Sequence, residues 1–487
     1  MNSYFSKYKL NYLVFFLIFF ILLIFYCKTF NYPFIWDDLE MIVNNSFIKD
    51  WHNISNIFTH SAFGEEFSTQ KFYRPIQILT YLFNYKIGGL NPVLFRFFNV
   101  VCFSFIGLFV FLISKFFSFT KTDSFLMTLL YCLHPVHVEI VTYVSGRGDV
   151  LYILFSLIAF YSFLKSKYDF SYYDCSVFIF TILAFLTKEN SVIVPVLFIV
   201  YAYIFKTKNN NFTSYVLLFF GVLYSSYRLF YIKTSTALSW INHASFYEKL
   251  STLAYSFVEY IKLFFFPYPL HMEYHHVESS FFNSYFFIAL LIFLIMFFLT
   301  KYSDNLRLYY FGIGWFFICL IPVSHVFVGL SSTIRQHWAS FAYLGLLFSV
   351  FTLLRPLILK NKILVRSVLV FCFFIFSFTV DHRNTFWSNA ELLYKNDLKY
   401  APQSFVLWNN LGYEKYKKND YILAKKYFLK SIYSAPGYAY DVALNNLGVI
   451  YEMQGDKVLA EYYYKKSISV GDYKLAKQNL IRLKTIK

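Results

Sequence analysis

Long apolar runs separated by short polar segments extend through the chain to about residue 380. About eleven of these runs reach or approach the roughly 17 to 25 residues that a helix needs to cross a bilayer. They cover residues 10–30, 94–114, 124–142, 150–164, 173–187, 190–205, 213–232, 281–300, 308–326, 338–354 and 364–380. The pattern therefore predicts an all-α polytopic membrane protein with about eleven transmembrane helices.

The polar segments between the runs predict an orientation. With a cytosolic N-terminus, the short inner loops carry most of the basic residues, as the positive-inside rule requires. These residues are Lys7, Lys9, Lys115, Lys121, Lys165, Lys167, Lys206, Lys208, Lys301, Arg307, Arg355, Lys360, Lys362 and Arg366. A further apolar stretch at 253–267 contains Glu259 and Lys262. We expect it to lie in, or dip into, the outer interface, because a span there would move the last basic cluster outside.

Composition narrows the functional classes. Of 487 residues 58% are hydrophobic and 15% charged, which is typical of a membrane protein. The net charge of +17 is dispersed over short loops and a Lys-rich C-terminal region, which argues against nucleic acid as a partner. The six cysteines lie within or at the ends of apolar runs without metal-ligand spacing, so neither a disulfide framework nor a zinc site is expected.

The C-terminal region becomes polar and contains an internal repeat. Residues 408–432 align with residues 444–468 at an offset of 36, with Gly412 and Gly448 where two helices are expected to approach closely. The unit resembles the tetratricopeptide repeat. We therefore expect a membrane domain at 1–382, with a long first outer loop at 31–90, followed by a short helical solenoid at 383–487. The solenoid could hold an extended peptide, or it could have only a structural or docking role.

The predicted outer face carries most of the candidate chemistry. Asp37 and Asp38 follow the first apolar run directly, although an Asp at such a place could simply cap a helix. Downstream motifs on the same face are YRP at Tyr73–Pro75, HPVHVE at His134–Glu139, GRGD at Gly146–Asp149, KEN at Lys188–Asn190 and RQHW at Arg335–Trp338. The outer face is therefore where an active site is expected.

The series WDD, YRP, HPxHxE, GRxD and KE, followed by helical repeats, resembles the TMTC-like O-mannosyltransferase group and its bacterial relatives in the GT-C superfamily. The resemblance implies a membrane enzyme that takes a mannose-like sugar from a polyprenyl-phosphate carrier. The sugar passes with inversion to an acceptor, expected to be a protein Ser or Thr hydroxyl, on the non-cytosolic face. In this interpretation Asp37 is the general base and Asp38 is its helper or the alternate base.

The resemblance also implies cations that bind the donor phosphate. The candidates are Arg74, Arg147, Lys188 and His337. The supporting residues are Asp149, His134, His137, Glu139 and Glu189. Asp149 is expected to orient Arg147 or cap a helix. Alternatives remain open: Arg147 with Asp149 could only stabilise a loop, Arg74 could be an interfacial Arg, and Lys188 could pair with Glu189.

No cofactor is expected for a monophosphate-linked donor, whereas a diphosphate-linked donor would favour a divalent cation. The spacing of His134, His137 and Glu139 could bind a metal ion, but we favour no metal there. The expected partners are the lipid-linked donor, a polypeptide acceptor bound by the repeats, and membrane lipid. The bias towards Phe, Tyr, Lys and Asn, typical of an AT-rich genome, and the lack of a retention signal favour a bacterial inner membrane over the endoplasmic reticulum.

Two other functional classes compete with the transferase. A membrane-anchored repeat scaffold without catalysis would need no reactive carboxylate. A transporter would show charged residues in the middle of its spans and a repeat among them. The charges gather instead at the outer ends of the runs, and no repeat is visible among the spans, so transport is disfavoured.

Overall fold

The computed structural model of the chain is all-α. It describes residues 2–63, 72–166, 171–207, 211–228, 245–274, 282–325, 332–435, 437, 440–471 and 473–485. Part of the predicted outer loop, at 64–71, lies outside the described residues, as do Lys167 and Lys208 of the predicted inner loops. The ends of three predicted spans, at 229–232, 281 and 326, also lie outside them.

Seven helices of the described chain are long and apolar enough to cross a membrane. They contain α1 (Asn2–Tyr26), α4 (Pro92–Phe116), α7 (Arg147–Lys165), α12 (Ser284–Leu299), α13 (Leu306–Leu320), α14 (Ala342–Lys360) and α15 (Lys362–Phe386). An eighth segment joins α5 (Lys121–Cys132) to Pro135–Thr142, which ends in α6 (Val138–Thr142), with a bend of 48°.

Three shorter apolar helices occupy the remaining predicted runs. They are α8 (Tyr172–Phe185), α9 (Val194–Phe205) and α10 (Asn211–Tyr227). All eleven predicted runs therefore contain helix, although only seven meet the length of a full span by themselves. The prediction of an all-α polytopic membrane protein is confirmed.

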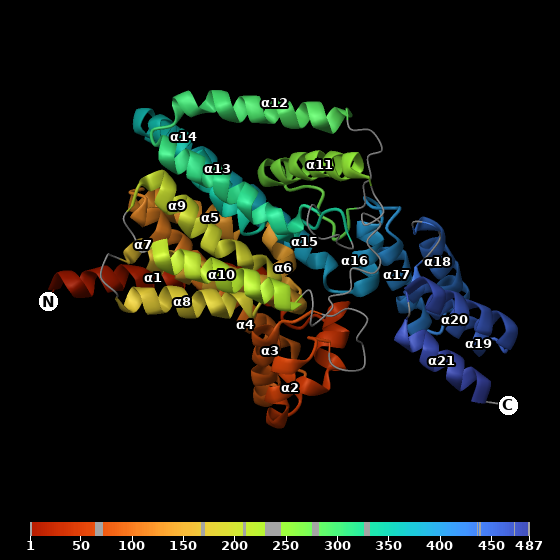
Figure 1. The fold of residues 1–487 in the computed structure, drawn as a ribbon. Helices are drawn as coiled ribbons and strands as arrows, with labels where there is room; N and C mark the ends of the chain where they lie inside the picture. Colours follow the sequence, from red (N-terminus) through yellow and green to blue (C-terminus); the bar gives the residue numbers. More distant parts are fainter. Residues whose placement is uncertain are drawn as a thin grey trace.

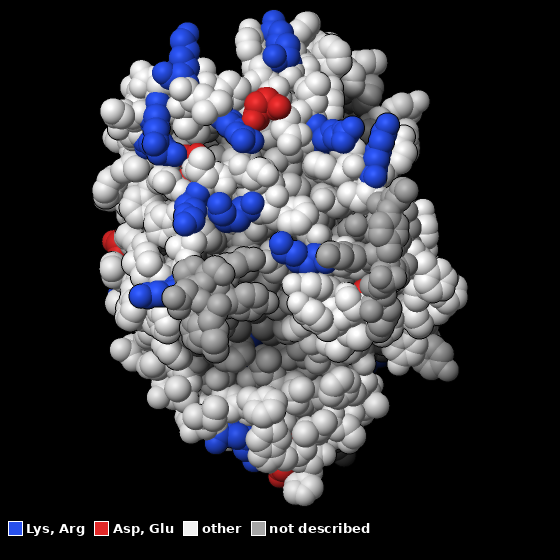
Figure 2. All heavy atoms as spheres, turned by 90° about the vertical axis from the view of Figure 1, so that its left-hand side faces the viewer, with Lys and Arg blue, Asp and Glu red and all other residues white. Residues whose placement is uncertain are grey.

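Lys and Arg predominate over Asp and Glu on one face of the molecule. The N-terminus lies on the left side of Figure 1, and the C-terminal helices lie on the right. Figure 2 shows the left-hand face, where Lys and Arg are scattered widely and Asp and Glu are few. Which side of the membrane this face meets stays a prediction, argued from the positive-inside rule.

The stretch predicted at the interface forms the longer helix α11 (Phe246–Phe265). Four charged residues, at 248, 249, 259 and 262, keep it out of the set of candidate spans. Figure 1 shows α11 running beside α12, and the two helices are in contact. This arrangement favours a helix that dips towards the apolar region over one that lies flat across it.

The first outer loop folds into short helical turns packed on a longer helix. After η1 (Cys27–Thr29), the chain forms η2 (Leu39–Val43), η3 (Ser46–Ile48), η4 (Trp51–Asn53), α2 (Ile54–Thr59) and α3 (Pro75–Gly88). Met41, Ile42 and Phe47 of the loop share a buried apolar cluster with Ile78 and Tyr81 of α3. This packing holds the segment that follows Asp37 and Asp38.

Six α-helices form the described part of the C-terminal region. They are α16 (Ala390–Asp397), α17 (Phe405–Lys417), α18 (Tyr421–Ser434), α19 (Asp441–Met453), α20 (Lys457–Gly471) and α21 (Lys474–Thr485). In agreement with the predicted repeat, α17 packs on α18 and α19 packs on α20. A Cβ at Gly412 would lie 2.7 Å from Phe428, and one at Gly448 would lie 2.6 Å from Tyr464. Assignment to the tetratricopeptide family stays a prediction.

The C-terminal helices begin inside the main core. Leu393 of α16 and Leu407 and Leu411 of α17 belong to the same buried apolar cluster as the membrane helices. The ring of Tyr394 lies 5.8 Å from that of Trp36 in an edge-to-face arrangement. Because Trp36 precedes Asp37, α16 is held directly against the loop that carries the Asp pair.

Candidate active site

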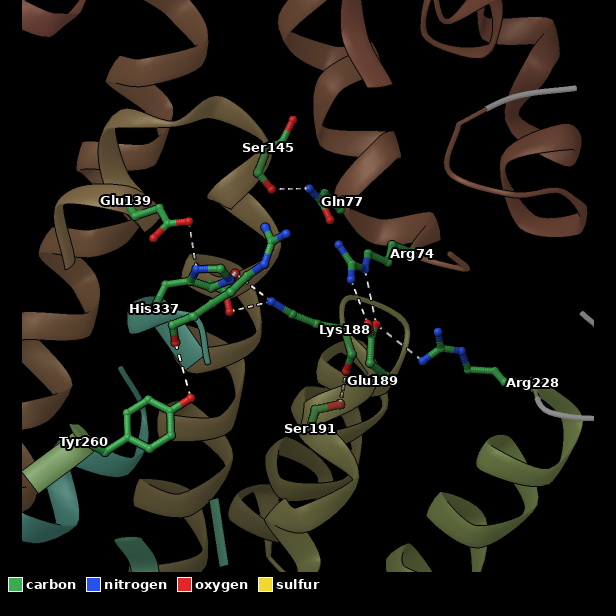
Figure 3. Close-up of polar contacts among 12 residues, drawn as sticks. Arg74, Gln77, Glu139, Ser145, Lys188, Glu189, Ser191, Arg228, Tyr260 and His337 are labelled. Atoms are coloured by element: carbon green, nitrogen blue, oxygen red, sulfur yellow. Dashed lines mark hydrogen bonds and ion pairs between the residues drawn. The ribbon is translucent and has the colours of Figure 1, made fainter. Parts of the chain in front are cut away.

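The two adjacent carboxylates, Asp37 and Asp38, have different environments. Asp38 is fully buried, and its Oδ1 accepts hydrogen bonds from the N–H of Ser145 at 2.7 Å and from its hydroxyl at 2.6 Å. The carbonyl of Ser145 accepts from Gln77 of α3 at 2.9 Å (Figure 3). Burial raises the pKa of Asp38 to about 6, against the lowering effect of the Ser145 hydrogen bond. Asp38 therefore ties the loop to the turn η6 (Val144–Gly146) and has little access to a substrate.

Asp37 is only partly buried. Its N–H donates to the hydroxyl of Tyr143 at 3.0 Å. Burial raises the pKa of the Asp37 carboxyl, while the positive charge of Arg335, a hydrogen bond with Tyr143 and the more distant Arg74 lower it. Of the two acids, Asp37 is the one whose carboxylate combines partial access with increased basicity.

Arg335 is the main cation near Asp37, and the sequence analysis did not select it. Its Nη2 lies 2.5 Å from Oε1 of Glu273, and its guanidinium lies 5.7 Å from the ring centroid of Trp36. Tyr260 of α11 donates to the main-chain carbonyl of Arg335 at 3.4 Å (Figure 3). The motif RQHW contained the signal, but the prediction took His337 from it rather than Arg335.

His337 and Lys188 each lie close to the carboxylate of Asp149, and His337 also contacts Glu139. Nδ1 of His337 lies 2.9 Å from Oε1 of Glu139, and its Nε2 lies 3.9 Å from Asp149. Lys188 donates to both carboxylate oxygens of Asp149, at 2.6 and 2.7 Å. Figure 3 shows Glu139, His337 and Lys188 converging on one region. Asp149 therefore pairs with Lys188, and the expectation that it orients Arg147 is wrong.

Arg74 and Arg228 share one carboxylate. Arg74 forms two hydrogen bonds to Glu189, at 2.7 and 3.2 Å, and Nη1 of Arg228 lies 3.4 Å from Oε2 of the same Glu (Figure 3). The alternative that Lys188 pairs with Glu189 is therefore wrong. Two guanidinium groups face one carboxylate, so this pair of arginines keeps a net positive charge that an anion could neutralise.

Arg147 does not belong to this group. Its side chain is fully buried, and it donates to Asn99 at 2.8 Å, to the carbonyl of Phe95 at 2.8 Å and to Thr80 at 3.2 Å. Its guanidinium also lies 4.5 Å from the ring centroid of Tyr81. With its donors directed into the protein interior, Arg147 holds α7 against α3 and α4. The structure therefore contradicts its predicted contact with donor phosphate.

Two residues of the predicted histidine motif, His134 and His137, lie together with ring centroids 6.0 Å apart, whereas Glu139 has another partner. Nε2 of His134 lies 3.1 Å from the carbonyl oxygen of Phe264, and His137 packs 4.6 Å from the ring centroid of Tyr131. Glu139 turns instead to His337. Among the described residues, no group of three or more His, Cys, Asp and Glu side chains is arranged to hold a metal ion. His134 and His137 both lie buried at the bend between α5 and α6.

Two cavities flank the charged residues. An apolar cavity of about 300 Å³ lies between the ends of α8 and α10, next to Arg228. It is lined by Ile182, Phe185, Leu186, Phe220, Leu223, Tyr224 and Tyr227. A more polar cavity of about 230 Å³ lies where the membrane region meets α16, and it includes Glu273, the partner of Arg335. The outer region thus offers an apolar space next to Arg228 and a polar space that includes Glu273.

Comparison with known proteins places the chain beside protein O-mannosyl-transferases. It is 24% identical over 399 residues to protein O-mannosyl-transferase F38B6.6 of Caenorhabditis elegans, covering 78% of this chain and 56% of that protein. It is 31% identical over 137 residues to TMTC3 of Mus musculus, covering 28% of this chain and 15% of the relative. For TMTC4 of Homo sapiens the identity is 30% over 165 residues, covering 30% of this chain and 22% of the relative.

The chain thus spans about half of the length of the worm protein (56%) and a smaller share of the mouse and human proteins. No protein-family model and no solved structure matches the chain. The resemblance to TMTC-like O-mannosyltransferases, drawn from the outer-face motifs, is confirmed by these relatives.

Proposed function

We propose that the chain is an inverting GT-C-type glycosyltransferase that moves a mannose-like sugar from a polyprenyl-phosphate carrier to a hydroxyl of an acceptor polypeptide. The names of its relatives support sugar transfer to protein. The observation that carries the proposal is the position of Asp37, a partly exposed carboxylate within electrostatic reach of Arg335 and Arg74. A base and two cations thus share one region of the outer face.

In the proposed reaction the Asp37 carboxylate accepts the proton of the acceptor hydroxyl. The hydroxyl oxygen forms a bond to the anomeric carbon of the sugar from the face opposite the phosphate. The bond between that carbon and the phosphate oxygen breaks, and the phosphate leaves with the electron pair. Partial burial supports Asp37 in this role because it strengthens proton binding, whereas the buried Asp38 positions the loop through Ser145.

Arg74 and Arg228 are proposed to bind the donor phosphate. Their shared Glu189 neutralises one of the two positive charges, so a phosphate would be attracted to the remaining one. The apolar cavity next to Arg228 suits the first isoprene units of the carrier. Lys188 and His337 lie beside acids of their own, and we propose that they orient Asp149 and Glu139 rather than hold the phosphate.

We propose that the outer face meets the non-cytosolic side of the membrane, because Lys and Arg predominate over Asp and Glu on the face that carries the N-terminus (Figure 2). A bacterial inner membrane is proposed on composition alone. For a monophosphate-linked donor the two arginines supply the positive charge at the phosphate, and the proposed reaction needs no metal ion. A diphosphate-linked donor would call for a divalent cation.

The proposal is tested with the purified chain in lipid nanodiscs. Polyprenyl-phosphate mannose and a Ser/Thr-containing peptide are added, and intact-mass analysis measures the gain of one hexose by the peptide. Transfer to the peptide hydroxyl, with inversion at the anomeric carbon, is expected. Absence of transfer would contradict the enzyme assignment, and transfer to lipid alone would contradict a polypeptide acceptor.

Arg228→Gln is expected to raise the KM for the lipid-linked donor about tenfold while kcat changes little, because a hydrogen bond to a charged group is lost. Steady-state kinetics at varied donor concentration provides the measurement. Arg355→Gln is the matched control, since Arg355 pairs with Asp304 at 3.1 Å on another part of the chain. An unchanged donor KM in the Arg228 variant would remove Arg228 from the phosphate site.

Arg335→Gln is expected to move the acid limb of the pH profile of kcat/KM to higher pH. Arg335 lowers the pKa of Asp37, so removing its charge raises that pKa and leaves the base protonated over a wider acidic range. Activity should therefore fall most at low pH and recover in part as the pH rises. A uniform loss at every pH would instead indicate that Arg335 acts only on the structure or on donor binding.

A further inference from the structure

The polar cavity of about 230 Å³ lies where the membrane region meets the C-terminal helices, and three parts of the chain form its walls. Tyr255, Glu259 and Lys262 recur at helical spacing along one face of α11. The second wall is the segment 269–274, and the third is the turn after α16, which carries Tyr400. The cavity therefore depends on the contact between the membrane region and the C-terminal region.

Aromatic rings fix the shape of one side of the cavity. The imidazole of His271 stacks on the ring of Tyr274, with centroids 3.7 Å apart, and on that of Tyr400, with centroids 6.0 Å apart. Its Nδ1 lies 2.8 Å from the main-chain carbonyl oxygen of Glu273, which holds the imidazole in one orientation. All three rings line the cavity. They offer a ligand apolar ring surface together with polar tips.

Each glutamate in the described lining of the cavity is paired with a cation. Oε2 of Glu259 lies 3.1 Å from the ammonium nitrogen of Lys262, and Oε1 of Glu273 lies 2.5 Å from Nη2 of Arg335. The site therefore carries little net charge, which favours a neutral ligand. Carboxylates only accept hydrogen bonds, an ammonium only donates them, and a tyrosine hydroxyl does either. A suitable ligand must therefore both donate and accept.

The volume of the cavity limits the size of the ligand. It is smaller than the roughly 300 to 1,000 Å³ of pockets for drug-sized ligands, so it suits a single small ring. A hexose in its pyranose form is such a ring. It is neutral, its hydroxyls donate and accept hydrogen bonds, and its C–H groups can pack on aromatic rings. One hexose thus meets the requirements of size, charge and hydrogen bonding together.

Main-chain and aromatic contacts connect the cavity to the catalytic loop. The carbonyl of Tyr274 accepts a hydrogen bond from the N–H of Thr333 at 3.0 Å. Arg335 follows two residues later, and its guanidinium lies 5.7 Å from the ring centroid of Trp36. Because Trp36 directly precedes Asp37, the cavity wall is joined to the segment that carries the proposed base.

We propose that the polar cavity binds a hexose already attached to the acceptor polypeptide, an inference that rests on the proposed transferase function. The sugar hydroxyls bond to Glu259 and Lys262, and the ring packs on the aromatic side. Arg74, Arg228 and Glu189 of the proposed phosphate site do not line this cavity, which favours the acceptor over the donor as the source of the sugar. An acceptor that carries a sugar should therefore bind more tightly than the same acceptor without one.

The test measures peptide affinity for the full chain in nanodiscs. Three fluorescent peptides share one Ser/Thr-containing sequence. The first is unmodified, the second carries one O-linked mannose, and the third carries an O-cyclohexyl group, a six-membered ring without hydroxyls. Wild type is expected to bind the mannosyl peptide about tenfold more tightly than either of the others, because a hydrogen bond to a charged group is gained.

Glu259→Ala is expected to abolish this tenfold preference while the unmodified peptide binds as it does to wild type. Glu414→Ala is the matched control. Glu414 pairs with Lys417 at 2.6 Å, also three residues along a helix and similarly buried, and it does not line the cavity. This control variant should keep the preference for the mannosyl peptide.

Three results would overturn the inference. They are equal affinity of wild type for the mannosyl and cyclohexyl peptides, a full preference in E259A, and an equal loss of preference in E414A. The first comparison uses wild-type protein, so a folding defect in a variant does not obscure it. D37N should abolish transfer and keep the preference. A preference for the mannosyl peptide without transfer by wild type would refute the transferase alone, and transfer without the preference would refute the sugar site alone.

Discussion

Asp37→Asn is expected to reduce sugar transfer by about 100- to 10,000-fold, the usual contribution of a general base. Asn keeps the size of the side chain but cannot accept the acceptor's proton. Insertion and folding should be unaffected, since Asp37 is partly exposed and Asp38 makes the buried contacts of the loop. The measurement is the initial rate of hexose transfer, together with the melting temperature of the purified variant.

Asp50→Asn is the matched control for this experiment. Asp50 lies in the same outer loop, is exposed, and accepts a hydrogen bond from the N–H of His52 at 3.0 Å that Asn can also accept. Its variant should retain the wild-type rate. Equal activity of the Asp37 variant and wild type would favour the rival interpretation of the chain as a membrane-anchored scaffold whose apolar region has no catalytic role.

Arg383→Met is expected to destabilise the fold by about 3–5 kcal/mol, because it leaves a buried carboxylate without its cation. Arg383 of α15 donates to Asp397 of α16 at 2.6 and 2.9 Å, and both side chains are almost completely buried. The main-chain N–H of Met272 also donates to Asp397 at 2.9 Å. The pair therefore joins the last membrane helix to the first C-terminal helix, and its loss should lower the thermal midpoint in detergent.

Two further variants test the electrostatic cause. R383M/D397N, which also neutralises the carboxylate, should be more stable than Arg383→Met because no unpaired charge remains buried. Arg355→Met should cost less than about 1 kcal/mol, since its partner Asp304 is partly exposed to solvent. A double variant no more stable than the single one would show that lost packing, not an unpaired charge, dominates.

The helical runs and the Asp pair could be found from the sequence because their signals are local. All eleven predicted runs contain helix, and Gly412 and Gly448 lie at the predicted close approaches. Only seven runs form full spans. The run at 124–142 is broken after α5, and α8, α9 and α10 are short. Both features depend on how the helices pack. The motif order also led to the correct group of relatives.

The partners of the charged residues could not be predicted. Motif spacing suggested that Asp149 holds Arg147, but Asp149 binds Lys188, which lies 39 positions away, and Arg147 is enclosed by Asn99, Phe95 and Tyr81. Arg335 went unselected, since the prediction took His337 rather than Arg335 from the RQHW motif. Its importance comes from its position near Asp37, which belongs to a separate loop.

The amino-acid sequence alone determined that this chain is an all-α membrane protein with a helical C-terminal region, because hydrophobic periodicity and repeat spacing are written along the chain. It also placed Asp37 and Asp38 at the exit of the first helix. Only the tertiary structure decided that Asp38 is buried against Ser145 while Asp37 stays partly accessible. It also decided which cations, such as Arg74 and Lys188, are already paired with an acid. Burial and ion pairing depend on which helix ends are in contact, and these contacts bring together residues that are far apart in the sequence.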